Sequence, residues 1–348
     1  MLTTLHNLLK STHNLFTRFF NTPMNIKIEQ NSPQTLISLF TDFDIKMNKI
    51  HNSGFQQHIK HLSNACTIKL KTNNSYQGVI TINFLYFPQD TSYITTLVHV
   101  IHVFTSSYPY NYSDLFINIC LDHLKRTIPD TNLPYSSMVK KTRQDSTAFN
   151  TSGVTVRSKN TIYITKKQEC VKLLIHELCH YVKMDYVLLS IQTPHLWDIS
   201  SDHINVSESY TETVAVILTT CYNSINLSLS FLELLNKEIS YSVYLTIKLL
   251  RLYCSNPINF FTSKTQRYEN EIQVWEYIIG RTNLLLNLDS LLDCLNNTLY
   301  VSESSALCVA SLATSDSKLI NLLPEFENMP QSISMSYMLL DTVPYRSL

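Results

Sequence analysis

Glycine is scarce in this sequence, with four residues in 348, whereas ordinary proteins contain about 7%. The nucleotide-binding loops that cradle phosphate groups need several glycines within a few positions. The sequence also contains no G-x-S-x-G motif, the turn that carries the nucleophile of many serine hydrolases. Nucleotide chemistry and serine-hydrolase chemistry therefore have no support in this sequence.

The eight cysteines are scattered, and no two of them form a C-x-x-C pair. This spacing excludes a zinc knuckle built from cysteines, and the number is low for a scaffold held together by disulfides. We therefore expect free thiols and an intracellular, reducing compartment.

Neither sign of charge is in excess, because 27 Lys and Arg residues balance 27 Asp and Glu residues. The sequence indicates no nucleic-acid partner and no anionic membrane surface. No apolar run approaches 18 residues, so we expect no membrane span. Residues 2–21 lack the unbroken apolar segment of a signal peptide, and we interpret them as a helix that packs on the body of the protein.

Hydrophobic residues make up 44% of the chain, enough for a proper core. Apolar and polar residues alternate in 65–72 and 78–87, with Asn73-Asn74 between them, which predicts a β-hairpin. Residues 160–167 alternate in the same way and predict another strand. The polar stretch 135–158 indicates a loop.

Helical patterns occupy much of the remaining chain. They cover 34–50, the continuous apolar run 92–107, the stretch 168–191, and almost everything after residue 206. Mixed strands and helices therefore come first and helices alone follow, so we predict an α+β fold. The expected parts are a helical region 1–50, an α/β subdomain 51–204 and an α-helical subdomain 205–348.

The motif His176-Glu177-Leu178-Cys179-His180 lies in the predicted helix 168–191. Residues four apart share one helix face, so His176 and His180 can direct their rings at one metal ion, and zinc binds imidazole nitrogen. Glu177 lies about 100° further round the helix and can accept a proton from a water molecule beside the metal. The motif predicts one Zn²⁺ ion, with Glu177 as the catalytic base.

The surroundings favour a metal site over a chance match. The helix around the motif is apolar, and two histidines with a glutamate between them are costly to bury without a metal. Cys179 lies about 100° from the histidines on the helix, so we interpret it as a small core residue.

A third ligand is needed, because zinc sites use at least three protein side chains. Glu208 and Glu212 lie 28 and 32 residues after His180 and are themselves four apart on a predicted helix. His195 and His203 are alternatives that the residues alone leave open.

Residues 160–216 resemble the gluzincin branch of the zincin metallopeptidases, through strand 160–167, the motif helix and the stretch "SESYTETVA". The resemblance implies a zincin-like mixed sheet with an active-site helix. It also implies Glu208 as the third zinc ligand and Glu212 as a brace for the first zinc histidine. The sequence departs from the gluzincin pattern at Ser207, where Asn is usual, and at Glu212, where Asp is usual.

A second resemblance competes for the third ligand. The motif followed by His195 is similar to the SprT-type pattern, in which three histidines hold zinc. That family usually has Gly after its third histidine, where this chain has Leu196, and it carries a basic DNA-binding surface that is not evident here.

The arrangement is also similar to metallopeptidases of large DNA viruses, which have a Ser-Gly turn before the edge strand, as at Ser152-Gly153. The abundance of Asn, Ser, Thr, Ile and Tyr is typical of AT-rich coding sequences such as those of these viruses. The resemblance implies a viral protein in the host cytoplasm or the virion.

Other polar residues near the motif are open to more than one interpretation. Asp185 can cap or tether the motif helix, or brace a ligand. The sequence does not choose among the candidates for stabilising an oxyanion, which are Tyr210, Tyr222, His195 and His203.

We therefore expect a zinc metalloendopeptidase that cleaves a protein or peptide substrate with water activated by the metal and Glu177. Strand 160–167 is expected to pair with the extended substrate. The alternatives are a SprT-like protease and a non-catalytic virion or interaction protein that keeps the metal as a structural staple.

Overall fold

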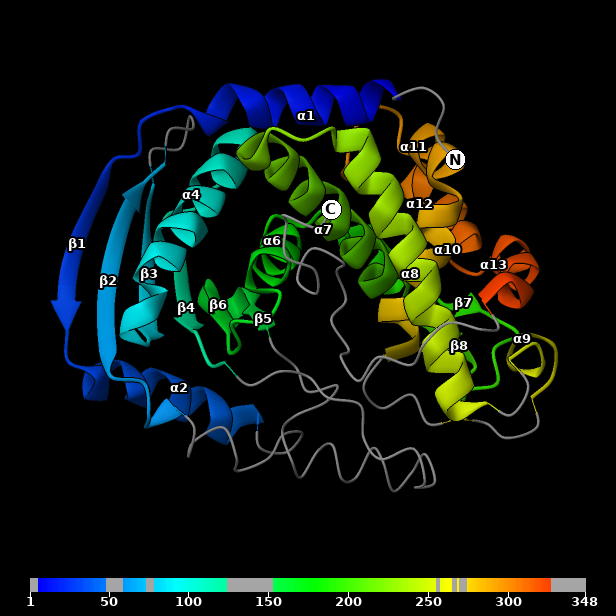
Figure 1. Cartoon of the computed structure of the whole chain (residues 1–348), viewed down its shortest axis with the longest axis horizontal. Helices are drawn as coiled ribbons and strands as arrows, with labels where there is room; N and C mark the ends of the chain where they lie inside the picture. The colour runs from blue at the N-terminus through cyan, green and yellow to red at the C-terminus, as the bar shows by residue number, and fades with distance from the viewer. Residues whose placement is uncertain are drawn as a thin grey trace. The chain divides into compact units, whose positions relative to one another are not determined.

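The computed structural model describes residues 6–47, 59–72, 78–123, 153–254, 257–264, 268 and 274–326. These residues form an α+β fold, as predicted, with a six-stranded mixed sheet and a helical region after it (Figure 1). The chain divides into two compact units. The sheet unit comprises Thr12–Arg126 and Lys140–Val182, and the helical unit comprises Met1–Ser11, Thr127–Val139 and Lys183–Leu348. The division expected at residues 50 and 204 stays a prediction.

The sheet has the strand order β1-β2-β3-β4-β6-β5. Its strands are β1 (Ile26–Asn31), β2 (Asn64–Lys71), β3 (Val79–Tyr86), β4 (Phe116–Cys120), β5 (Gly153–Val156) and β6 (Thr161–Ile164). The first three strands pair antiparallel, β3, β4 and β6 run parallel, and β5 is antiparallel to β6. The antiparallel pair β2–β3 confirms the predicted hairpin, whose turn at Asn73-Asn74 lies outside the described residues.

Strand β6 corrects the expectation for residues 160–167. It has β4 on one side and β5 on the other, so it has no edge at which a substrate strand could pair. The 3₁₀ turn η2 (Arg157–Lys159) and the left-handed backbone of Asn160, with φ 47°, reverse the chain. Gly153–Val156 thus folds back beside β6, inside the stretch interpreted as a loop, and β5 is the edge strand at that end of the described sheet.

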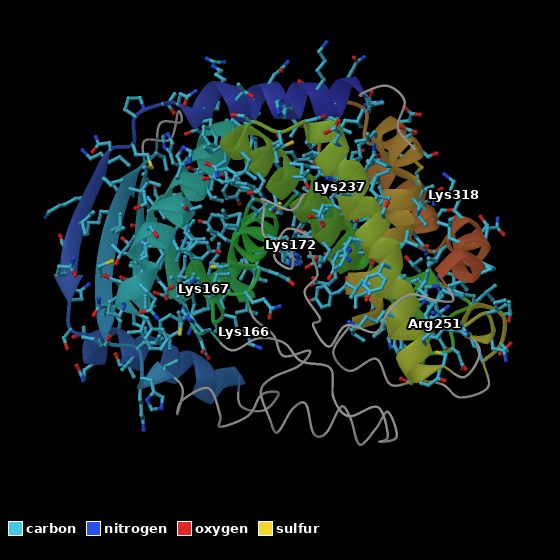
Figure 2. The ribbon with its side chains drawn as sticks, in the orientation of Figure 1. Lys166, Lys167, Lys172, Lys237, Arg251 and Lys318 are labelled. Atoms are coloured by element: carbon cyan, nitrogen blue, oxygen red, sulfur yellow. A yellow bond between two sulfur atoms is a disulfide. The ribbon has the colours of Figure 1, made fainter. Side chains whose placement is uncertain are left out.

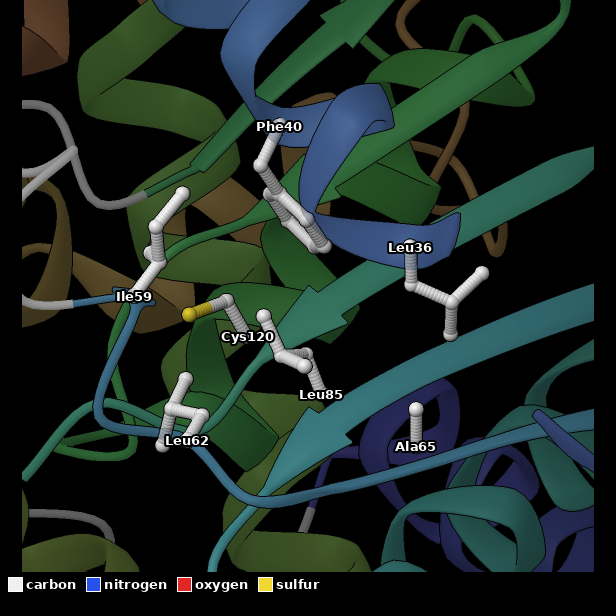
Figure 3. Packing of buried hydrophobic residues seen from close by; sticks show 7 residues of the cluster. All are labelled: Leu36, Phe40, Ile59, Leu62, Ala65, Leu85 and Cys120. Atoms are coloured by element: carbon white, nitrogen blue, oxygen red, sulfur yellow. The ribbon is translucent and has the colours of Figure 1, made fainter. Parts of the chain in front are cut away.

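Helices cover the sheet unit and bury its apolar side chains. Helix α2 (Pro33–Met47) contacts β2 and β3, where its Leu36 and Phe40 pack with Leu85. Figure 3 shows this cluster, which also contains Ile59, Leu62, Ala65 and Cys120. The short turn η1 (Pro88–Asp90) leads into α4 (Thr91–Ser107), the buried helix predicted from 92–107, which connects the parallel strands β3 and β4.

Helix α1 (Asn7–Phe20) confirms the helix expected near the N-terminus. Its Phe16 is buried, and the Phe16 ring meets that of Tyr108 edge-on at 6.3 Å between centroids. His99 on α4 donates from Nε2 to the Phe20 carbonyl at 2.8 Å. None of the helices in the described part of the chain combines the length and the apolar character that a membrane span requires.

The helical unit is built around α7 (Val206–Leu227), which is buried along most of its length and contacts α8, α10, α12 and η4. Its other elements are η3 (Tyr186–Ser190), β7 (Thr193–Pro194), β8 (His203–Ile204), α8 (Phe231–Tyr253), α9 (Asn259–Thr262), η4 (Glu276–Gly280), α10 (Arg281–Leu286), α11 (Leu288–Cys294), α12 (Glu303–Ala313), α13 (Ser317–Leu322) and η5 (Leu323–Phe326). The helical character predicted after residue 206 is confirmed in the residues that the structure describes, while 327–348 lie outside them. The two-stranded pair β7–β8 and the π-helical form of η4 were not predicted.

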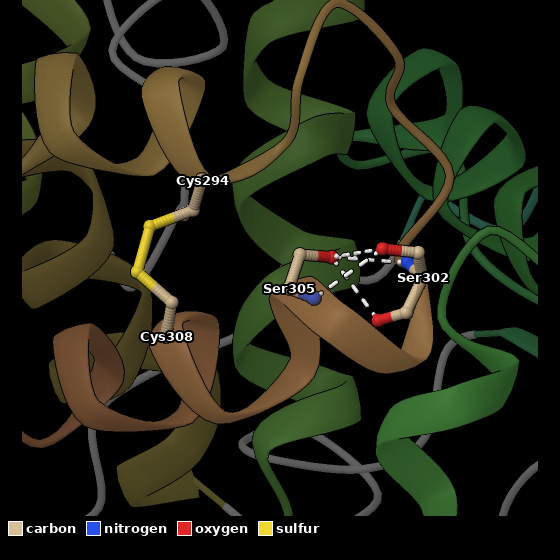
Figure 4. The surroundings of a disulfide bond; sticks show 4 residues. All are labelled: Cys294, Ser302, Ser305 and Cys308. Atoms are coloured by element: carbon tan, nitrogen blue, oxygen red, sulfur yellow. Dashed lines mark hydrogen bonds between the residues drawn. A yellow bond between two sulfur atoms is a disulfide. The ribbon is translucent and has the colours of Figure 1, made fainter.

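One disulfide, Cys294–Cys308, joins α11 to α12 (Figure 4). The expectation of free thiols is therefore wrong for this pair, while the other six cysteines form no disulfide. A separation of 14 residues gave no recognisable spacing, and the packing of α11 against α12 brings the two Cα atoms within 6.3 Å. Between them, Ser302 and Ser305 form a capping box that begins α12.

Candidate metal centre

The motif lies on α6 (Cys170–Tyr181), a shorter helix than the predicted 168–191. It begins after Glu169, whose φ is 58°, and it ends before Lys183, whose φ is 65°. A left-handed residue cannot continue a right-handed helix, so the chain turns away there and forms η3. Lys172, which is labelled in Figure 2, lies on α6 one turn before His176. It pairs with Glu169 at 3.6 Å, and both side chains are buried.

The two motif histidines converge. Nε2 of His176 lies 3.0 Å from Nε2 of His180, and the rings meet edge-on with centroids 4.6 Å apart. Two nitrogens bound to one zinc ion at about 2.05 Å in tetrahedral geometry lie about 3.4 Å apart. The observed separation is thus close to that of two ligands of one metal, and it also allows the rings to share one hydrogen.

Glu177 is buried beside the histidines and is held by the edge strand β5. The Thr155 hydroxyl lies 2.7 Å from Glu177 Oε2 and 2.9 Å from the Glu177 main-chain carbonyl, and it donates its hydrogen to this pair of acceptors. A Cβ atom on Gly153 would lie 2.7 Å from Glu177 Oε1. The strand therefore approaches the carboxylate as closely as a residue without a side chain permits.

Arg157 completes this support at the other end of the motif. Its Nε donates to the main-chain carbonyl of His180 at 2.9 Å, in the last turn of α6. Gly153, Thr155 and Arg157 lie in the stretch that sequence analysis interpreted as a loop. Their contacts with the motif were therefore missed, although Gly153 itself was noted.

His176, His180 and Glu208 form a group that could hold one metal ion. Glu208 is the acidic residue in the first turn of α7. Two imidazole nitrogens and one carboxylate oxygen form a donor set that zinc accepts. The predicted zinc ligands are therefore present as one candidate metal centre.

Glu212 lies one turn further along α7 and has a partner that the sequence did not reveal. Its Oε2 is 3.8 Å from Nη1 of Arg281 on α10, and both side chains are buried. Arg281 is the only basic residue in the largely apolar run 274–288, and a single positive charge in such a run was the available signal. The role of Glu212 as a brace for His176 stays a prediction.

The other candidate residues lie in the helical unit and are not part of this group. His195 Nε2 lies 3.2 Å from the Ser201 carbonyl, and burial lowers the pKa of His195 to about 4. His195 and His203 are not members of the group formed by His176, His180 and Glu208. Tyr210 donates its hydroxyl to the Leu299 carbonyl at 2.6 Å, and burial raises the pKa of Tyr222.

Two further sequence interpretations have a structural outcome. Cys179 is wholly buried and forms no disulfide, as expected of a core residue. Asp185 is also wholly buried, and its carboxylate accepts a hydrogen bond from the hydroxyl of Ser207, directly before Glu208.

Comparison with known proteins finds a relative in a mimivirus. The chain is 34% identical over 324 residues to "Uncharacterized protein R210" of Acanthamoeba polyphaga mimivirus, a match that covers 88% of this chain and 83% of that protein. No protein-family model and no solved structure matches the chain.

Proposed function

The chain belongs to the same family as the mimivirus protein R210, and we propose that it is a zinc-dependent metallopeptidase. The observation that carries the proposal is the convergence of two histidine Nε2 atoms, 3.0 Å apart, beside a buried glutamate held by a neighbouring strand. The relative is a mimivirus protein, which supports the viral origin that composition and resemblance implied.

The proposed ligands are His176, His180 and Glu208. Imidazole nitrogen favours zinc and other transition metals over magnesium or calcium, which prefer oxygen donors. Two histidines and one carboxylate also occur as the iron site of some oxygenases. Glu177 argues for zinc hydrolysis, because a carboxylate next to the ligands is the proton carrier that hydrolysis of a peptide needs.

Bound zinc would polarise the scissile carbonyl and acidify a water molecule. Glu177 accepts the proton from that water and later delivers it to the leaving amine. Thr155 holds the Glu177 carboxylate in one orientation through the 2.7 Å hydrogen bond. The Glu177 side chain therefore does not have to change its rotamer before the proton transfer.

We assign the substrate strand to β5 rather than to β6. In the part of the sheet that the structure describes, β5 pairs with β6 along one edge only. An extended peptide can add to a free strand edge through main-chain hydrogen bonds. Because β5 also contacts Glu177 through Thr155, a peptide on this edge would pass the catalytic base. The proposed substrate is therefore an unfolded or extended segment of protein.

The proposal is tested by metal analysis of the purified protein together with digestion of an unfolded protein mixture. The expected result is one zinc ion per chain and cleavage that a chelator abolishes and added zinc restores. The matched control is His176→Ala combined with His180→Ala, which removes both nitrogen ligands.

Two results would overturn it. Stoichiometric iron in place of zinc would indicate oxygenase chemistry. Stoichiometric zinc without cleavage of any unfolded protein would favour the metal as a structural staple.

A further inference from the structure

Glu208 is flanked in sequence by two serines, Ser207 and Ser209, and both are wholly buried in the first turn of α7. Each serine hydroxyl donates to an acceptor outside α7, and the two acceptors lie in different segments of the helical unit. Ser207 Oγ donates to Oδ2 of Asp185, and Ser209 Oγ donates to the main-chain carbonyl of Glu276 at 3.0 Å. The proposed ligand is thus held from both neighbouring residues.

Other hydroxyls of α7 behave differently. Thr213 donates to the Ser209 carbonyl at 2.8 Å, and Thr220 donates to the Val216 carbonyl at 2.7 Å. This bond to the carbonyl four residues earlier is the ordinary choice of a hydroxyl inside a helix. Ser207 and Ser209 are therefore distinguished from these residues by their partners as well as by their position.

Asp185 is a suitable anchor because its own backbone is fixed. It precedes η3, and its carbonyl accepts from the N–H of Leu188 at 2.9 Å. A carboxyl group with no exposed surface is costly to bury unless it is hydrogen-bonded, and Asp185 accepts from Ser207. The Ser207 hydroxyl therefore has a buried and well-placed partner.

Ser207 and its partner Asp185 hold the residue before Glu208, and we call this arrangement, together with Ser209 and its partner, the clamp. The second side of the clamp, at Ser209, is formed by the π-helical turn η4. A Cβ atom on Gly280 would overlap Ser209 Oγ, so α7 approaches η4 as closely as a glycine allows. The main-chain N–H of Asn205, which precedes α7, donates to Oε1 of Glu276 at 3.3 Å. Helix α7 therefore begins against η4 through both its backbone and Ser209.

We propose that Ser207 and Ser209, with Asp185 and Gly280 behind them, are positioning residues that fix the Glu208 carboxylate for the metal. The inference rests on the proposed role of Glu208 as a zinc ligand. Groups that orient a ligand change metal affinity by about 10–100-fold when they are removed. A backbone held on both sides of the ligand removes the alternative starts of α7 that would otherwise compete with binding.

The test uses the full-length chain with four single substitutions: Asp185→Asn, Ser207→Ala, Gly280→Ala and, as a control, Thr213→Val. Thr213 is equally buried on the same helix, but its hydroxyl bonds only within α7. Zinc affinity is measured by competition with a chelator, and the melting temperature of each chelated protein is measured beside it. The absorption spectrum of the Co²⁺-substituted protein reports the geometry of the ligands.

The expected result is zinc affinity about 10–100-fold weaker in Asp185→Asn, Ser207→Ala and Gly280→Ala, with an altered Co²⁺ spectrum, while Thr213→Val binds as wild type does. Ser207→Ala keeps the test decisive if Asp185→Asn fails to fold. Unchanged affinity in a variant whose chelated form melts lower would make the serines purely structural and overturn the inference. If wild type binds zinc but cleaves nothing, the peptidase proposal fails. The zinc affinities of the variants would still show whether the two serines position Glu208 for the metal. A wild type without metal affinity overturns both.

Discussion

Thr155 and Glu177 are joined by a hydrogen bond of 2.7 Å between the threonine hydroxyl and a carboxylate oxygen. The bond connects the edge strand β5 to the helix that carries the metal motif. A Cβ atom on Gly153 of the same strand would lie 2.7 Å from Glu177 Oε1, so the strand packs directly against this carboxylate as well as hydrogen-bonding to it.

Replacement of Thr155 by Val removes the hydroxyl at nearly constant volume. We expect kcat to fall by about tenfold to a hundredfold, because a misplaced catalytic group costs rates of that order. KM and zinc content should stay unchanged, since neither the ligands nor the strand backbone is altered. Steady-state kinetics check this, with Thr155→Ser as the control that keeps the hydroxyl. A full rate in Thr155→Val would show that Glu177 needs no help from β5.

Alanine substitutions separate the candidates for the third ligand. Glu208→Ala should lose zinc during mild dialysis, whereas His195→Ala should keep both zinc and most activity. Glu212→Ala should keep zinc, with weakened activity and with unfolding free energy lower by about 3–5 kcal/mol, because Arg281 would be left buried without its carboxylate. Metal analysis and denaturant unfolding check these outcomes. If Glu212→Ala alone empties the site, the ligand must be reassigned by one helical turn.

The buried His195 predicts acid sensitivity of the metal-free protein. Its pKa is lowered by burial from the ordinary 6.5 to about 4, so the folded state favours the neutral ring. Its contribution to stability is fully present above pH 6.5 and is lost as the pH falls from 6.5 towards 4. Unfolding free energy measured in chelator across this range should fall less steeply in His195→Gln. Identical slopes in the two proteins would contradict this role.

The Cys294–Cys308 disulfide should stabilise the helical unit. It closes a loop between residues 14 apart, and cross-links of this length contribute about 3 kcal/mol by the chain-entropy account. Cys294→Ser should therefore shift the denaturant midpoint downwards, and reductant should shift wild type to the same point. Wild type that is insensitive to reductant would argue that the two thiols are free in solution.

The periodic parts of the fold were predictable because local patterns determine them. The alternation in 65–72 and 78–87 gave β2 and β3, and the apolar run 92–107 gave α4. The spacing of His176 and His180 predicted convergent rings for the same reason, since helix geometry alone brings residues four apart together.

The supporting contacts were not predictable from local patterns. Strand β5 is four residues long and exists because β6, reached through a turn, offers it hydrogen bonds. The end of α6 depends on the left-handed Lys183, a residue type that signals no helix stop. The partners of Ser207 and Glu212 lie 22 and 69 residues away in sequence, and nothing near either residue indicates them.

The central claim is that Glu177 carries the proton in a zinc-dependent hydrolysis, and Glu177→Gln tests it most directly. The substitution keeps the size of the side chain and an acceptor for the Thr155 hydroxyl, and it leaves His176, His180 and Glu208 intact. Zinc content and the rate of peptide cleavage are measured on the same preparation. We predict wild-type zinc content with cleavage slower by about 10²–10⁴-fold, the contribution of a general base. A Glu177→Gln protein that holds zinc and cleaves as fast as wild type would contradict the account.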